Sequence, residues 1–172
     1  GNYSFFADIL WKDGTVETVC FGIFVEEAGN LQQNTDLTAM GSYPDGYQPS
    51  VALSWPIDGF HTISYGYQEK HTGIDIGGSG IRGKQVLAAA DGTVSMAEYH
   101  GGDGYRIDIE HADGMKTVYC HCAELNVAVG DTVRAGDAIA SVGKTGLATG
   151  DCLHFGVEIN GKTIDPTGLL AK

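Results

Sequence analysis

Two histidines and one aspartate in this sequence have the side-chain types of a catalytic zinc site. His71 and Asp75 lie in "HTGIDIGG", and His154 lies much later, in "GDCLHFGVEI". Hydrolytic zinc sites combine imidazole nitrogens with a carboxylate oxygen and keep one position for water. His71 and Asp75 can converge on one point, because side chains four residues apart share a face of an extended segment. The alternative for this pair is a loop histidine beside an Asx turn.

Alternation along the stretch "CLHFGV" predicts that His154 points away from the core. His154 shares one face of this strand with Cys152 and Gly156. The other face, which we expect to be buried, carries the large apolar side chains Leu153, Phe155 and Val157. This pattern favours a ligand role for His154 over a place in the core.

A further histidine, His121, lies in the strand-like stretch "TVYCHCAEL". Strict alternation predicts that Tyr119 and His121 share one face, with Cys120 and Cys122 on the other. The "CHC" triplet is a candidate metal cluster in its own right. Because successive strand residues face opposite ways, only part of it could reach one ion.

These side chains must be positioned by short strands. From about Val86 onward, turn signals separate alternating or β-rich runs such as "YRIDIE" and "KTVYCH", which indicates an all-β sandwich or barrel. The turn signals are Asp91-Gly92, Asp103-Gly104, Asp113-Gly114, Gly130-Asp131 and Gly136-Asp137. We expect residues 55–172 to form the main domain.

Residues 1–54 differ in pattern, and we expect an N-terminal arm or subdomain there. Two apolar runs flank "KDG", which could be a hairpin, and a short helical turn is expected around Asp36–Met40. The longest apolar run, "VCFGIFV", is far shorter than the roughly 20 residues that span a bilayer. No basic-then-apolar leader follows Gly1, so any export signal is expected to lie outside this chain.

Charge and cysteine content narrow the function further. The chain has 172 residues, with 22 acidic against 10 basic side chains and a net charge of -12. Such a surface repels phosphate backbones, so we expect no nucleic-acid partner. Four cysteines do not make a disulfide framework in a chain of this length. The oligomeric state cannot be deduced from the sequence.

From roughly Trp55 to Leu169, the chain resembles the lysostaphin-type zinc endopeptidases of the LytM-like group. The resemblance rests on "HTGIDIGG", the Y-x-H strand in "TVYCH", the turn "VGDTVRAGDAI" and the closing strand "LHFGVEI", in that order. It implies a compact antiparallel β fold of the duplicated hybrid motif type, with a metal in a groove across one sheet. It also implies hydrolysis of peptide bonds in peptidoglycan cross-bridges or stem peptides, and therefore an extracytoplasmic location: secreted, in the wall or membrane-anchored.

The same resemblance assigns roles to individual residues. It implies a Zn²⁺ ion held by His71, Asp75 and His154. It places the base that orients or deprotonates the attacking water at His121, and it implies that Tyr65 or Tyr67 helps to hold the oxyanion. The remaining histidines have other expected roles: His111 structural, His61 and His100 solvated.

The chain departs from the family pattern around its last ligand. Cys152 stands where the family has a second active-site histidine, Asp151 replaces a proline, and Gly156 replaces an acidic residue. Three roles are open to Cys152: a thiolate ligand that closes the site, a weak hydrogen-bond donor or acid, or an inert filler that leaves His121 to work alone. We predict that zinc binding is retained and that peptidase activity is reduced or narrowed.

Three further hypotheses remain open. The chain could be a non-catalytic zinc-binding LytM-like module, regulatory or wall-binding, which Cys152 favours. It could be a biotinyl- or lipoyl-carrier-like domain modified at Lys116, but this reading leaves the histidines without a role. The arm could cover the groove, with Asn30 or Asn34 in the vacant metal position.

Overall fold

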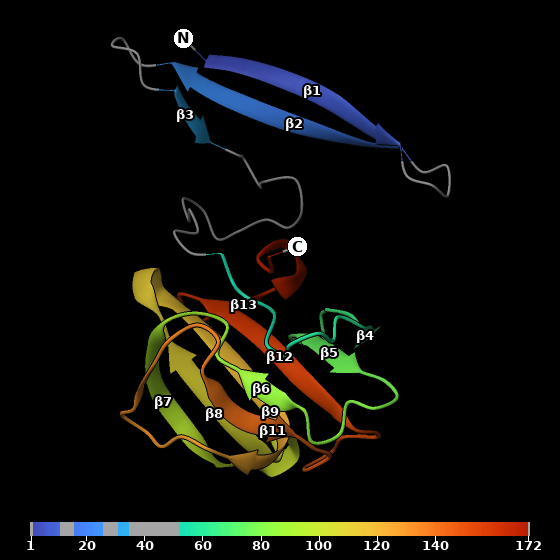
Figure 1. Ribbon diagram of the computed structural model, residues 1–172, viewed down its shortest axis with the longest axis vertical. Coiled ribbons are helices and arrows are strands. Elements are labelled where there is room, and N and C mark those ends of the chain that lie inside the picture. The colour runs from blue at the N-terminus through green and yellow to red at the C-terminus, as the bar shows by residue number, and fades with distance from the viewer. Residues whose placement is uncertain (1, 11–15, 26–30, 35–51, 172) are drawn as a thin grey trace. The chain divides into compact units, whose positions relative to one another are not determined.

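A computed structural model describes residues 2–10, 16–25, 31–34 and 52–171 of the chain (Figure 1). The chain divides into two compact units, Gly1–Ser42 and Tyr43–Lys172, and each is described here by itself. The predicted division between residues 54 and 55 stays a prediction. Among the described residues, no helix is long and apolar enough to cross a membrane.

The N-terminal unit contains a three-stranded antiparallel sheet. Strand β1 (Asn2–Leu10) pairs with β2 (Val16–Val25), which in turn pairs with β3 (Leu31–Asn34). The β1–β2 pairing agrees with the hairpin that the sequence favours around "KDG". The helical turn expected at Asp36–Met40 and the side chains of Asn30 and Asn34 lie outside the described residues.

The C-terminal unit is built almost entirely from antiparallel strands, which confirms the predicted all-β class. Its main sheet runs in the order β10-β7-β8-β9-β12-β5-β4, while β11 pairs with β6 and β9, and β13 pairs with β12. The strands are β4 (Ile63–Tyr65), β5 (Ile74–Gly77), β6 (Gln85–Leu87), β7 (Gly92–Tyr99), β8 (Tyr105–Glu110), β9 (Met115–Leu125), β10 (Thr132–Val133), β11 (Ala138–Val142), β12 (Cys152–Ile159) and β13 (Lys162–Ile164). Turns of 3₁₀ helix occur at Gly101–Asp103, Ala112–Gly114 and Pro166–Gly168.

One face of this sheet is apolar and the other carries polar side chains. Phe155 and Ile107 on the main sheet share a single buried cluster with Val86 on β6 and Ile139 on β11. Strands β6 and β11 therefore close the core over that face. On β12 the predicted alternation is confirmed, because three of its side chains are fully buried in the core: Leu153, Phe155 and Val157.

Strand β9 does not follow simple alternation. Its pairing with β8 runs from Tyr105↔Cys122 to Ile107↔Tyr119, so two residues of β9, Cys120 and His121, lie opposite the single residue Arg106. This is a β-bulge, and its residue His121 has a left-handed φ of 65°. Because of this bulge, the side chain of His121 lies on the face opposite to the one that simple alternation predicts.

The prediction that Tyr119 and His121 share a face is therefore wrong. Tyr119 is fully buried in the core, together with Cys122. His121 instead lines the polar groove on the opposite side, and Cys120 lines a small cavity beside it. A bulge inserts one extra residue, which shifts the alternation by one position from there onward.

Candidate metal centre

The structure brings His71, Asp75 and His154 together on the polar face of the sheet. Asp75 on β5 and His154 on β12 are direct partners across the two strands. Asp75 Oδ1 lies 2.8 Å from His154 Nδ1 and 3.1 Å from His71 Nε2, and the two histidine nitrogens are 3.1 Å apart. Among the residues that the structure describes, this is the one group of three or more potential ligands that converges so closely.

The hydrogen bonds around the group suit a cation. His71 Nδ1 lies 2.9 Å from the carbonyl oxygen of Gly66, to which it donates, and this leaves a lone pair on Nε2. That lone pair faces the carboxylate of Asp75. One cation can bind all three ligand atoms at once, whereas a proton can be shared by only two of them. Zinc bonds of about 2.0–2.1 Å place tetrahedral ligand atoms about 3.3 Å apart, close to the spacing found here.

The environment of Asp75 also favours its charged form. Burial by itself raises the pKa of this carboxyl, but the hydrogen bond and charge of His154, together with those of His71, outweigh burial and lower the pKa below its usual value. Asp75 is therefore a carboxylate at neutral pH, as a metal ligand must be.

Gly73 lets the two ligand-bearing segments approach each other. A Cβ atom at this position would lie 2.5 Å from the carbonyl oxygen of Phe155 and 2.7 Å from Nε2 of His154. Any side chain there would displace the imidazole of His154. The small residue in "HTGID" is thus a requirement of the close packing of strand β12 against the segment that leads into β5.

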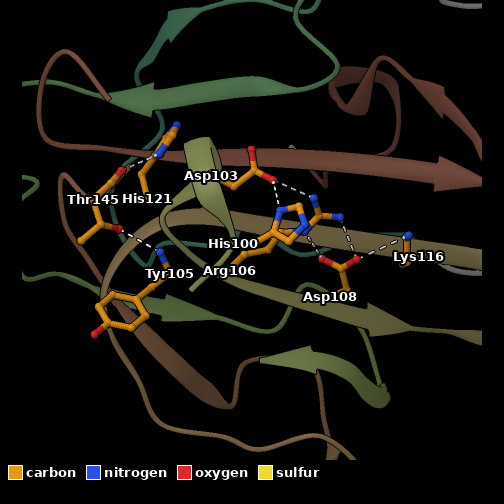
Figure 2. Close-up of polar contacts among 8 residues, drawn as sticks. All are labelled: His100, Asp103, Tyr105, Arg106, Asp108, Lys116, His121 and Thr145. Atoms are coloured by element: carbon orange, nitrogen blue, oxygen red, sulfur yellow. Dashed lines mark hydrogen bonds and ion pairs between the residues drawn. The ribbon is translucent and has the colours of Figure 1, made fainter. Parts of the chain in front are cut away.

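His121 reaches the same groove from strand β9. Its ring centroid lies 6.2 Å from that of His154. Its Nδ1 is 2.9 Å from the carbonyl oxygen of Thr145, to which it donates a hydrogen bond (Figure 2). This bond selects the tautomer in which Nε2 carries the lone pair, which is the form of a general base.

The groove that contains these residues has a volume of about 1010 Å³. Its lining includes the segment around β4 and β5 and the loop between β11 and β12, where Leu147 is 83% exposed. The principal lining residues are Ser64, Tyr65, Lys70, Thr72, Gly77, Gly102, Asp103, Leu147, Thr149, Asp151 and Cys152, besides the histidines and Asp75.

Cys152 lies on the same strand face as His154, as predicted. Its side chain is 9% exposed and lines the groove, but its sulfur is not part of the converging ligand group. Burial, with the charges of Asp75 and Asp151, raises the pKa of this thiol to about 11. In the metal-free protein the thiol is therefore neutral at physiological pH.

The other two cysteines of the main domain are buried and protonated. Burial raises the pKa of Cys122 to about 12, and it also raises the pKa of Cys120. Of the "CHC" triplet, only His121 lines the main groove. The triplet thus does not form a metal cluster among the described residues.

Two tyrosines were candidates for the oxyanion role, and the structure separates them. Tyr65 lines the groove with its ring edge-on to His71, at a centroid distance of 4.7 Å. The hydroxyl of Tyr67 instead donates to the carbonyl oxygen of Thr163, 3.1 Å away. Tyr65 is consequently the one that can contact a substrate in the groove.

The remaining predicted residues have surface or structural environments. His111 is held between the carbonyl of Asp91 and the hydroxyl of Thr117. His61 and His100 are exposed, and His100 pairs with Asp103. Lys116 is the second residue of strand β9, and its amine forms ion pairs with Asp108 and Glu158.

Two departures from the family pattern have visible consequences. Asp151 lines the groove and pairs with Arg82 at 3.3 Å. Gly156 leaves room beside His154, where a cavity of about 70 Å³ is lined by Arg106 and Glu158, among others. The role of Thr145 could not be predicted, because it depends on contacts between segments that are distant along the chain.

Comparison with known proteins now identifies the family. The family model of peptidase family M23 matches residues 69–166, a span that includes His71, Asp75, His121 and His154. The chain belongs to peptidase family M23. The family implies a metal, and the converging group of His71, Asp75 and His154 fits one. The resemblance drawn from the sequence is confirmed.

Among curated M23 relatives, DD-carboxypeptidase/endopeptidase Mpg of Neisseria meningitidis is 39% identical over 99 residues, which cover 58% of this chain and 22% of Mpg. Murein hydrolase activator NlpD of Salmonella typhimurium is 37% identical over 120 residues, which cover 69% of this chain and 31% of NlpD. The chain thus spans less than a third of the length of these relatives.

A solved peptidase structure agrees with the fold. The catalytic domain of the antimicrobial peptidase lysostaphin from Staphylococcus simulans superposes with a TM-score of 0.53 and 30% sequence identity. The match covers 62% of this chain and 86% of the lysostaphin domain. The antiparallel β architecture is therefore that of the M23 family.

Proposed function

We propose that this chain is a zinc-dependent endopeptidase that cleaves peptide bonds in peptidoglycan cross-bridges or stem peptides. The observation that carries the proposal is the convergence of His71, Asp75 and His154 inside a groove that His121 enters from the other side. Two imidazoles, one carboxylate and an open groove are the donor set of a hydrolytic zinc site, whereas structural zinc sites are closed.

Each residue has a role in this mechanism. His71, Asp75 and His154 would hold Zn²⁺, which supplies Lewis acidity and lowers the pKa of a bound water to about 7. His121, with its Nδ1 proton held by Thr145, accepts a proton at Nε2 and later returns it to the leaving amine. Tyr65 lines the groove where its hydroxyl can hydrogen bond to the substrate.

Cys152 limits the rate in this proposal. The family pattern supplies a second histidine at this position, and a buried neutral thiol is a poorer acid-base group and a weaker hydrogen-bond donor than imidazole. Loss of one acid-base group commonly costs about 10²–10⁴-fold. The wild-type chain is therefore expected to bind zinc fully and to turn over slowly.

A second function has a specific observation in its favour. Cys152 and the likeness to NlpD, named as a murein hydrolase activator, support a zinc-binding module that regulates another enzyme or binds the wall without cleaving it. Both functions place the chain outside the cytoplasm, in contact with the wall.

One experiment separates these two proposals. The zinc-loaded wild type and Cys152→His are incubated with purified muropeptides, and the products are followed by mass spectrometry. We expect slow cleavage by the wild type and faster cleavage by Cys152→His. Equal rates would overturn the limiting role of Cys152. Stoichiometric zinc with no product from the wild type would select the non-catalytic module.

A further inference from the structure

Thr145 connects three parts of the molecule beside His121, and nothing in the sequence singles it out. It lies in the loop between β11 and β12, and it contacts β8 and β9 through its hydroxyl and its carbonyl group (Figure 2). We propose that Thr145 is a positioning residue that fixes the orientation and tautomer of His121. This inference rests on the proposed function, because it assigns His121 the role of base.

The hydroxyl of Thr145 completes the hydrogen-bond ladder where the bulge offsets the strands. Tyr105 on β8 and Cys122 on β9 are register partners. The N–H of Tyr105 donates to Thr145 Oγ1 at 3.0 Å, and Oγ1 donates to the carbonyl of Cys122 at 2.7 Å. One side chain thus satisfies a donor and an acceptor of two neighbouring strands, so its position is tightly determined.

The carbonyl of the same residue acts on His121. It accepts the hydrogen bond from Nδ1 at 2.9 Å, which leaves Nε2 without a proton. His121 also has a φ of 65°, a region that a residue other than glycine occupies only when its surroundings enforce it. Thr145 helps to stabilise this backbone conformation, since its hydroxyl donates to the carbonyl of Cys122, the residue that follows His121.

Close packing prevents Thr145 from moving independently. A Cβ atom on Gly104 would collide with the hydroxyl and carbonyl groups of Thr145, and one on Gly146 would collide with the carbonyl of Gly102. Both glycines have positive φ, 68° at Gly104 and 70° at Gly146. The loop and the turn before β8 therefore interlock, and the hydroxyl of Thr145 is the polar contact that joins this loop to both β8 and β9.

The test compares the zinc-loaded full chain with Thr145→Val, which has the same shape without the hydroxyl, and with Thr145→Ser, which retains it. Thr93→Val, on the exposed surface of β7, is the matched control. Nitrogen-15 NMR reports the tautomer of His121, and muropeptide assays report kcat and KM. Zinc content is measured for every variant.

We expect Thr145→Val to mix the two tautomers of His121 and to lower kcat about 10–100-fold, with KM and zinc content unchanged. Thr145→Ser and Thr93→Val should match the wild type in both readouts. An unchanged tautomer in Thr145→Val contradicts the proposal, whether kcat is retained or lost. If the valine variant does not fold, Gly104→Ala displaces Thr145 from the other side and should produce the same mixture.

The two proposals can fail separately. Absence of turnover in the wild type refutes the proposed peptidase activity. The tautomer of His121 is read by NMR without any substrate, so in that case it still decides whether Thr145 positions this ring.

Discussion

Two parts of the groove place their functional side chains by different means: the ligand wall, formed by β5 and β12, and the base wall, formed by β9. On β12 and β5, strict alternation along regular strands directs His154 and Asp75 to one point. On β9, a bulge turns His121 toward the groove against the alternation, and Thr145 from a distant loop holds it there. The ligand wall therefore depends on strand periodicity, and the base wall depends on an irregularity supported by a loop.

Removal of a ligand is expected to have the largest effect. His154→Ala deletes one of three donors, so the purified protein should retain almost no zinc, and cleavage should fall below detection. Metal content by mass spectrometry and activity on muropeptides measure both effects. The matched control is His61→Ala, an exposed histidine outside the groove, which should keep full zinc. Full zinc content in His154→Ala would show that the ligand wall is assigned wrongly.

Removal of the base should separate the two walls. His121→Ala leaves all three ligands in place, so zinc content should equal that of the wild type, while kcat falls about 10²–10⁴-fold. Zinc titration and steady-state kinetics on the same preparation test this. Loss of zinc in this variant would mean that His121 belongs to the metal site and that the two walls are not distinct.

The same contrast explains what the sequence could predict. The outward face of His154 and the buried side of β12 follow from residue type and period, since no bulge interrupts that strand near His154. The full candidate set of His71, Asp75 and His154 came from the family resemblance. The shared face of Tyr119 and His121 was predicted wrongly, because a bulge results from the pairing with β8 and leaves no mark in the local pattern. The partner of His121 could not be predicted, since Thr145 meets it through tertiary contacts.

A substitution next to the ligand wall should produce an intermediate effect. Gly73→Ala introduces a methyl group 2.7 Å from His154 Nε2 and 2.5 Å from the carbonyl of Phe155, so the segment and β12 must separate. Overpacking of this kind costs about 1–3 kcal/mol of unfolding free energy, and zinc affinity should fall with it. Urea unfolding and zinc titration measure the two effects. Gly80→Ala is an informative comparison, because its Cβ meets nothing within 4 Å although its φ is positive. It should weaken stability without changing zinc affinity.

The pH dependence of the metal-free protein should give the smallest effect, and it tests the ligand wall alone. The pKa of Asp75 is lowered in the folded state by His154 and His71. A depressed pKa stabilises the fold above the unfolded value of about 3.9, and this contribution is lost as the pH falls through the folded value. The unfolding free energy of the metal-free wild type should therefore decrease on acidification below about pH 4 more than that of Asp75→Asn. Asp58→Asn, at an exposed position, should follow the wild type. Equal acid sensitivity in the wild type and Asp75→Asn would show that the two imidazoles do not stabilise this carboxylate.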